Sequence, residues 1–145
     1  MLAKNDTPAN IEVEVDIPES SRRIKADAYY LNRILSNLVT NAIQAMPFGG
    51  KLAIQTKKEE TDTILSVKDT GVGIPENIRD KMFTLMFTTK SRGQGFGLPV
   101  VKRIPESLGG AVTFESQVGE GTTFTVRLPP PKRNKRENGL QVKKP

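Results

Sequence analysis

Two asparagines, Asn37 and Asn41, stand four residues apart within a segment whose apolar residues recur at helical spacing. On a helix this spacing places their side chains one above the other, at the border of the apolar stripe. Two amide oxygens in such a position could hold a hard cation directly or through water. Asparagines that simply face the solvent are the other interpretation of the same spacing.

A carboxylate followed by alternate glycines occurs in DTGVGIP, where Asp69 ends an apolar run and Gly71 and Gly73 follow. Glycines allow the backbone to approach a flat ligand closely. A carboxylate beside them can accept a hydrogen bond from an exocyclic amine. A turn that only ends a strand is the alternative.

Three more alternate glycines, Gly93, Gly95 and Gly97, follow the cations Lys90 and Arg92. The N–H groups of such a loop and of a following helix can face an anion, and the glycines permit a lid that orders over a nucleotide. The stretch is neither a P-loop nor a Rossmann fingerprint, because GK[ST] and a GxGxxG after a strand are missing. A flexible loop with solvated charges is the alternative.

The surrounding patterns predict the elements that carry these residues. Apolar residues at helical spacing predict a long helix over 28–46 with Asp27 as its N-cap, and a second helix is expected at about 98–108, which Pro105 should kink or shorten. Alternating patterns predict strands at IEVEVDI and, as two antiparallel pairs, at KLAIQTKK with TILSVKD and AVTFESQ with TTFTVRLP. RRIKAD predicts a short partner strand, and ENIRDKMF a short amphipathic piece.

Hairpin strands with segregated helices indicate an α+β fold: a two-layer α/β sandwich with one mixed, mostly antiparallel sheet and helices on one face. We expect one folded domain over 1–129 and a basic, disordered tail over 130–145. From Pro129 onward, six basic residues and one acid account for five of the six net positive charges. The positive charge therefore belongs to the tail, and no nucleic-acid partner is expected.

Composition excludes several kinds of site. The chain has no cysteine and no histidine, which removes disulfides, thiolate metal sites and histidine bases. No run of about eighteen apolar residues and no secretory leader is present. We expect no membrane segment in this chain and a soluble protein of the cytoplasm.

Five motifs follow one another in a fixed order: NLVTNAIQAM, DTGVGIP, MFTLMFTTK, GQGFGLPVVKRI and GEGTTFTVRLP. Together they resemble the N box, first glycine box, F box, second glycine box and following GxGT turn of the catalytic ATP-binding domain of sensor histidine kinases. That domain has a Bergerat-type ATP-binding fold and belongs to the wider superfamily of gyrase, Hsp90 and MutL ATPases. The resemblance spans roughly residues 11–129, and the chain departs from the usual pattern at Gln44, Phe96, Pro99 and Pro105.

The resemblance implies roles for individual residues toward ATP and magnesium. Asn41 would ligate Mg directly, with Asn37 near the phosphates, and Asp69 would receive the adenine amino group with Thr122 assisting through water. The remaining implied contacts are Gly71, Gly73 and Ile74 in the base pocket, and a mobile ATP lid with its following helix start: Phe87, Thr88, Thr89, Lys90, Gly93, Gln94, Gly95, Phe96, Gly97 and Leu98. Lys90 and the glycine amides would contact the β- and γ-phosphates.

The implied activity is transfer of the γ-phosphoryl group of ATP to a histidine. Superfamily members that hydrolyse ATP usually carry glutamate where this chain has Asn37, so Asn37 favours histidine phosphorylation over hydrolysis. With no histidine in the chain, the acceptor would lie on a separate dimerisation domain, a response regulator would be a further partner, and this domain alone would be a monomer. A superfamily ATPase and a nucleotide-binding module without transfer are the alternatives.

Overall fold

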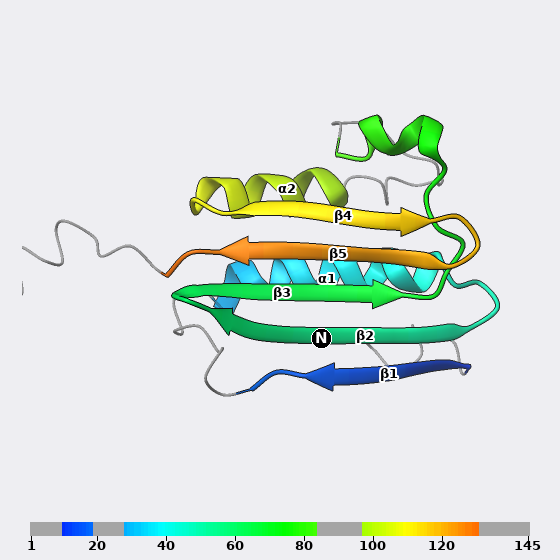
Figure 1. The fold of residues 1–145 in the computed structure, drawn as a ribbon, viewed down its shortest axis with the longest axis horizontal. Coiled ribbons are helices and arrows are strands. Elements are labelled where there is room, and N and C mark those ends of the chain that lie inside the picture. The colour runs from blue at the N-terminus through cyan, green and yellow to red at the C-terminus, as the bar shows by residue number, and fades with distance from the viewer. Residues whose placement is uncertain (1–9, 19–27, 84–96, 131–145) are drawn as a thin grey trace, which may run out of the picture.

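The computed structural model describes residues 10–18, 28–83 and 97–130. The strands are β1 (Ile11–Asp16), β2 (Gly50–Glu59), β3 (Asp62–Asp69), β4 (Ala111–Gln117) and β5 (Gly121–Leu128), and the helices are α1 (Ala28–Gln44), the short 3₁₀ helix η4 (Glu76–Lys81) and α2 (Gly97–Ser107). Figure 1 shows the strands side by side in one sheet, with α1 lying behind β3 and β5. The predicted α+β sandwich with helices on one face is confirmed.

The sheet is mixed, in the order β1-β2-β3-β5-β4 (Figure 1). β1 pairs with β2 in parallel, with Val13 opposite Leu52, and all other pairs are antiparallel. Both predicted antiparallel pairs are therefore confirmed. The expected partner strand for IEVEVDI, RRIKAD, lies outside the described residues, and β2 is the neighbour of β1 instead.

Helix α1 buries one stripe of its surface. Ile34, Leu38, Val39 and Ala42 are buried and recur at the spacing of one helical face. The helix ends at Gln44, two residues before the predicted end, and the chain then turns through Pro47 and Phe48. The proposed N-cap, Asp27, lies outside the described residues.

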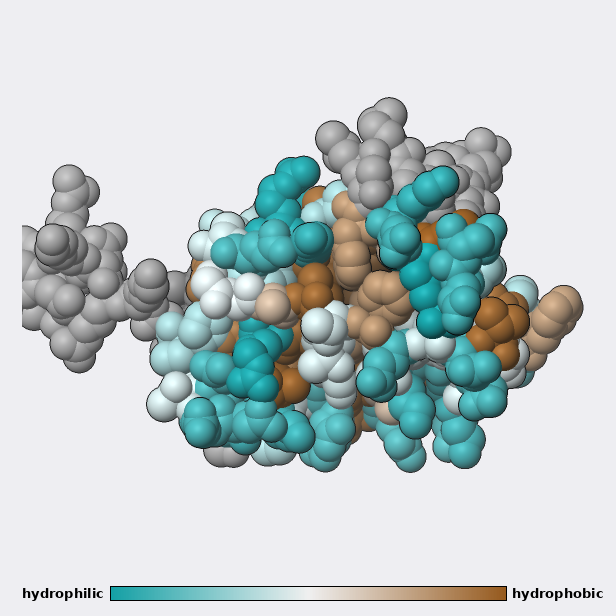
Figure 2. Space-filling view, turned by 45° about the horizontal axis from the view of Figure 1, so that its top comes forward, coloured by the Kyte–Doolittle hydropathy of each residue, from teal (hydrophilic) through white to brown (hydrophobic). Residues whose placement is uncertain are grey.

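The core lies between the sheet and its helices. Alternate strand residues point toward α1 and α2 and are buried: Leu52 and Ile54 on β2, Leu65 and Val67 on β3, and Phe124 and Val126 on β5. The opposite face of the sheet carries charged residues, and Figure 2 shows hydrophilic side chains over the lower part of the view, where β1 to β3 lie. The sheet therefore has one buried and one solvated face.

Helix α2 ends in a glycine cap. Pro105 is buried two residues before the end of the helix. Gly109 has a φ of 88°, and the N–H of Gly110 donates to the carbonyl oxygen of Pro105 at 2.7 Å, which is the pattern of a Schellman motif. The helix spans almost the predicted range and continues for two residues past Pro105, so the proline does not shorten it as expected.

Two expectations about the chain as a whole have different outcomes. The described helices are too short or too polar to cross a membrane. The predicted boundary between a domain at 1–129 and a tail at 130–145 stays a prediction, because residues 131–145 lie outside the described part of the chain.

Candidate functional site

A cavity of about 290 Å³ opens where α1 and β3 end and β5 begins, at the right-hand end of the sheet in Figure 1. Eleven residues line it: Asn41, Gln44, Ala45, Asp69, Val72, Gly73, Ile74, Pro75, Ile78, Met82 and Thr122. They come from the end of α1, the turn after β3, η4 and the start of β5. Five residues singled out from the sequence therefore meet in one cavity: Asn41, Asp69, Gly73, Ile74 and Thr122.

Asp69 is the acidic group of this cavity. It is only 3% exposed, and its Oδ1 accepts hydrogen bonds from the N–H of Gly71 at 2.8 Å and the N–H of Thr122 at 3.3 Å. The first of these closes a tight turn around the carboxylate, as aspartates commonly do where strands end. The carboxylate is thus held in place by backbone donors in the lining of the cavity.

Thr122 lies directly opposite Asp69 in the pairing of β5 with β3. It is 5% exposed, and its hydroxyl lies 2.8 Å from the hydroxyl of Ser116 on β4. The Ser116 oxygen also accepts from the N–H of Ile74 at 2.8 Å. Three strands and the turn after β3 therefore meet in one hydrogen-bonded group at the edge of the cavity.

The two glycines after Asp69 are required by contacts within the protein. A Cβ at position 71 would collide with the carbonyl oxygen of Ala45 at the end of α1. Gly73 has a φ of 79°, and a Cβ there would collide with the carbonyl of Gln117. Gly73 lines the cavity and Gly71 does not. Both allow the turn to pass between α1 and the β4–β5 turn.

Arg79 on η4 fixes the outer side of the turn. Its Nε donates to the carbonyl oxygen of Ile74 at 3.0 Å, and one terminal nitrogen donates to the carbonyl oxygen of Ser116 at 2.8 Å. η4 is thereby held against β4 and the turn. Ile78 and Met82 lie four residues apart in the same segment. They form an apolar wall of the cavity.

Helix α1 contributes two amides, Asn41 and Gln44, to the opposite side. Asn41 is partly buried, as its predicted place at the border of the apolar stripe requires. Asn37 is also partly buried but does not line the cavity, since it lies one turn further from the end of the helix. Asn41 and Gln44 are therefore the two amides of α1 that line the cavity itself.

The lining fits a planar heterocyclic base. Ile74, Ile78 and Met82 supply apolar surface, and Asp69 and Thr122 are adjacent, buried polar groups. Pockets for small molecules are mostly apolar with a few placed polar groups. The amide oxygen of Asn41 is of the type that magnesium binds, and among the described residues no group of three acidic side chains forms an alternative metal site.

Residues 26–132 match the family described as Histidine kinase-, DNA gyrase B-, and HSP90-like ATPase. The chain belongs to this family. The match covers Asn37, Asn41, Asp69 and Thr122 together with all the other residues that line the cavity. The family suggested by the order of the five motifs is thus confirmed.

Curated relatives in this ATPase family include sensor histidine kinases. The chain is 37% identical over 130 residues to the sensor histidine kinase ZraS of Salmonella typhimurium, covering 89% of this chain and 28% of that protein. It is 35% identical to sporulation kinase C of Bacillus subtilis, covering 89% of this chain and 30% of the relative. The chain therefore spans less than a third of the length of these relatives.

Solved structures in the family have the same fold. The nucleotide-free catalytic domain of the histidine kinase ThkA is 34% identical with a TM-score of 0.72, over 83% of this chain and 79% of that one. Full-length ShkA in complex with AMPPNP is 26% identical with a TM-score of 0.69, over 85% of this chain and 26% of that one. The sandwich architecture is thus that of histidine kinase catalytic domains.

Most residues expected in the family's ATP lid lie in a segment that the structure does not describe. Phe87, Thr88, Thr89, Lys90, Gly93, Gln94, Gly95 and Phe96 lie outside the described residues. Gly97 is the first residue of α2, and the adjacent Leu98 is buried in the core. Their roles toward nucleotide stay predictions.

Five residues of the site escaped sequence reasoning. Ala45, Ile78 and Met82 line the cavity, whereas Ser116 and Arg79 support it from outside. The spacing of Ile78 and Met82 in ENIRDKMF is a signal for one face of a short helix. The β4–β5 hairpin register, once fixed, places Ser116 opposite Thr122. The contacts of Arg79 leave no comparable signal in the sequence.

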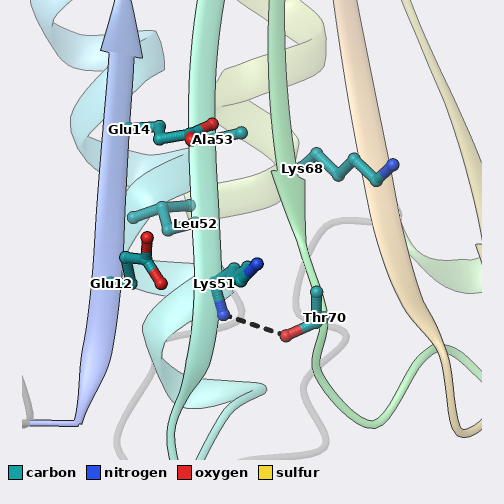
Figure 3. Close-up of a pocket in the computed structure, with 7 residues that line it drawn as sticks. All are labelled: Glu12, Glu14, Lys51, Leu52, Ala53, Lys68 and Thr70. Carbon is teal, nitrogen blue, oxygen red and sulfur yellow. Dashed lines mark hydrogen bonds between the residues drawn. The ribbon is translucent and has the colours of Figure 1, made fainter.

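A second hollow, of about 220 Å³, lies on the solvated face of the sheet (Figure 3). Its cause is the short side chain of Ala53, which is flanked across the strands by the longer Glu14 and Lys68. Figure 3 shows Glu14 leaning over β2 while Lys68 extends toward β5. None of the residues proposed for the site lines this hollow.

Proposed function

We propose that the cavity binds the adenine ring of ATP and that the chain is the catalytic domain of a sensor histidine kinase. The γ-phosphoryl group would pass to a histidine on a separate dimerisation domain. Transfer forms a bond between phosphorus and an imidazole nitrogen, breaks the bond between the γ-phosphorus and the bridging oxygen of ADP, and releases the imidazole proton. A response regulator would then take the phosphoryl group.

The observation that carries this proposal is the buried pair Asp69 and Thr122 in the lining of a largely apolar cavity. A fixed carboxylate suits the exocyclic amino group of adenine, and apolar walls suit its ring. The family relatives are sensor histidine kinases, and the related ShkA structure holds an ATP analogue. The acceptor histidine would lie outside these 145 residues, which contain none, either in the same full-length protein or in another chain.

The phosphate groups would extend from the base toward the end of α1. Asn41, which lines the cavity there, would ligate magnesium, and Gln44 lies near it on the same helix. Magnesium bound with ATP would neutralise charge on the phosphates. Asn37 and Lys90 are proposed to act on the phosphates from one turn earlier on α1 and from the lid. Since an asparagine is no general base, hydrolysis by water should be slow.

Asp69→Asn tests the base pocket. A hydrogen bond to a charged group contributes about 1.5–3 kcal/mol, so the variant should bind ATP at least about tenfold more weakly. Isothermal titration with Mg-ATP measures this loss. Asp16→Asn, on an exposed aspartate of β1, is the matched control and should bind as the wild type does. Unchanged affinity in Asp69→Asn would contradict the proposed pocket.

Phosphotransfer needs a separate assay. The wild-type chain is incubated with γ-labelled ATP, magnesium and a histidine-bearing dimerisation domain of a related sensor kinase. We expect acid-labile label on that domain with the wild-type chain. With the Asn41→Ala variant of the chain, the domain should stay unlabelled. Bound nucleotide without transfer to any such domain would favour a binding module, and rapid release of free phosphate would favour an ATPase.

A further inference from the structure

A row of side chains runs along α1 away from the cavity. Its members, spaced three or four residues apart, are Gln44, Asn41, Asn37, Arg33 and Tyr30. This spacing places them on one face of the helix. The first two line the cavity. Arg33 stands eight positions before Asn41, and the helical rise therefore puts the two residues about 12 Å apart along the axis.

Arg33 and two tyrosines form a cluster on the first two turns of α1, at the left-hand end of that helix in Figure 1. Tyr29 and Tyr30 are 61% and 42% exposed, and their rings meet edge to face with centroids 5.3 Å apart. A terminal nitrogen of Arg33 donates to the Tyr29 hydroxyl at 3.2 Å, and its guanidinium carbon lies 6.0 Å from the centre of that ring. These three side chains are called the Tyr–Arg patch below.

The charge of Arg33 is not compensated within the described part of the chain. Its side chain is exposed, and the ion pairs found among the described residues do not include it. A guanidinium group has five donors in a fixed fork, and the Tyr29 hydroxyl takes one of them. The rest of the fork can receive a carboxylate. The Tyr–Arg patch therefore suits a surface that presents an acidic side chain.

The composition of the Tyr–Arg patch is typical of a protein–protein interface. Tyrosine and arginine are enriched at interfaces and among the residues that contribute most to binding. Tyrosine supplies a large contact area at a low entropic cost because it has few rotatable bonds. The contacts among the three side chains also order them before a partner arrives, which reduces the entropy that is lost on binding.

We propose that the Tyr–Arg patch is a docking surface for the dimerisation domain that carries the acceptor histidine, and that Arg33 binds a carboxylate of that domain. The inference rests on the proposed function, which requires such a domain to approach the phosphates. With the base in the cavity and the phosphates beside Asn41 and Asn37, Arg33 would lie one helical turn beyond the phosphates. The patch is thus continuous with the face of α1 that the acceptor must reach.

A second copy of this chain does not fit the same patch. In a two-fold symmetric contact the patch would face itself. Two copies of Arg33 would then meet, and the patch contains no acidic residue to separate them. Like charges across an interface oppose association. The charge of Arg33 therefore favours a different, acidic partner surface.

Phosphotransfer kinetics test this docking surface. The wild-type chain and its variants are incubated with γ-labelled Mg-ATP and increasing concentrations of the histidine-bearing dimerisation domain of a related sensor kinase. Arg33→Met keeps the length of the side chain but not its charge, and it should raise the KM for that domain about tenfold. The kcat and the Kd for ATP should stay within about twofold of the wild-type values, because Arg33 does not line the cavity.

Three further measurements complete the design. Arg33→Lys keeps the charge without the fork and should restore part of the loss. Tyr30→Ala should raise the KM for the domain at least about fivefold by removing contact area. Lys68→Met is the matched control, since it removes an exposed cation from the solvated face of the sheet, and it should change neither KM nor kcat. Added salt should raise the KM of the wild type more than that of Arg33→Met.

The outcomes separate the docking surface from the proposed function. If Arg33→Met weakens ATP binding or lowers kcat but leaves the KM for the domain unchanged, Arg33 acts on the nucleotide and the inference is wrong. If all variants keep the wild-type kinetics, the patch has no part in docking, and the inference fails while the kinase activity stands. If the wild-type chain binds ATP but labels no such domain, the proposed function fails and the docking surface with it.

Discussion

Three polar residues are buried in the described part of the chain: Thr63, Asp69 and Thr122. Asp69 and Thr122 line the cavity, and each has hydrogen-bonding partners in the protein. Thr63 lies on β3 beneath the helices, far along the strand from the cavity, and its hydroxyl has no partner among the described residues. Burying a polar group costs free energy. The burial of Asp69 and Thr122 at the cavity therefore indicates a function, whereas the burial of Thr63 only lowers the stability of the fold.

Thr63→Val should therefore stabilise the protein. Valine has nearly the shape of threonine but lacks the unpaired hydroxyl, and we expect the free energy of unfolding to rise by about 1 kcal/mol. Urea denaturation at 25 °C measures this change. Thr125→Val, at a half-buried position on the other face of β5, is the control and should change stability by less than about 0.5 kcal/mol. A destabilised Thr63→Val would mean that the hydroxyl has a partner.

At the scale of elements, ion pairs connect β2, β3 and β5 at the end of the sheet opposite the cavity. Arg127 on β5 donates to Asp62 at 2.7 Å and to Glu59, which lies across β3 on β2. The hydrogen bond from Arg127, and then its positive charge, hold the pKa of Glu59 below its usual value of 4.5. One arginine thus links the β2–β3 hairpin to β5.

This link gives a dependence of stability on pH. The pKa of Glu59 is lower in the folded state than in the unfolded state. The ionised carboxylate therefore adds to the free energy of unfolding at pH values above the unfolded-state pKa, and this addition is lost as the pH falls through the folded-state pKa. Arg127→Met should therefore lower stability at pH 7 by a small amount, since the groups are exposed, and the difference from wild type should shrink at about pH 3. Urea denaturation at both pH values measures it.

The same experiment has an internal control on α2. Arg103→Met removes an exposed arginine remote from Glu59 and should show no comparable change between the two pH values. Added salt should weaken the effect of Arg127→Met at pH 7, because it screens exposed charges. An equal loss of stability at both pH values would assign the role of Arg127 to packing of its side chain instead.

At the scale of the whole molecule, the cavity lies between the two layers of the sandwich. Asn41 and Gln44 come from the helical layer, and Asp69 and Thr122 come from the sheet. A nucleotide in the cavity would contact both layers at once. Binding to the folded state alone stabilises it in proportion to the logarithm of ligand concentration.

ATP should therefore raise the stability of the whole domain. With ATP at 100 times its dissociation constant, the free energy of unfolding is expected to rise by about 2.7 kcal/mol. Asp69→Asn with tenfold weaker binding should gain only about 1.4 kcal/mol at the same ATP concentration. Urea denaturation with and without Mg-ATP measures both values. Equal stabilisation of the two proteins would place the nucleotide elsewhere.

The sequence by itself determined most of the helices and strands and indicated several residues that line the cavity. The spacing of Ile34, Leu38 and Ala42 fixed one face of α1, and alternation indicated the buried residues of β2 and β5, because both follow from local backbone geometry. On β1 the alternating Val13 and Val15 are exposed. Asp69 before two glycines marked the end of a strand for the same reason. The order of the motifs then indicated the family.

Only the tertiary structure decided which residues meet. The parallel pairing of β1 with β2 and the contact of Arg79 with β4 join residues far apart in the chain, and the contact of Ser116 with Thr122 depends on the register of the β4–β5 hairpin. Such pairings depend on packing of the whole sheet against its helices, which local patterns do not encode. For the same reason the glycine at 71 proved necessary for the passage of backbone beside α1, a contact that exists only after folding.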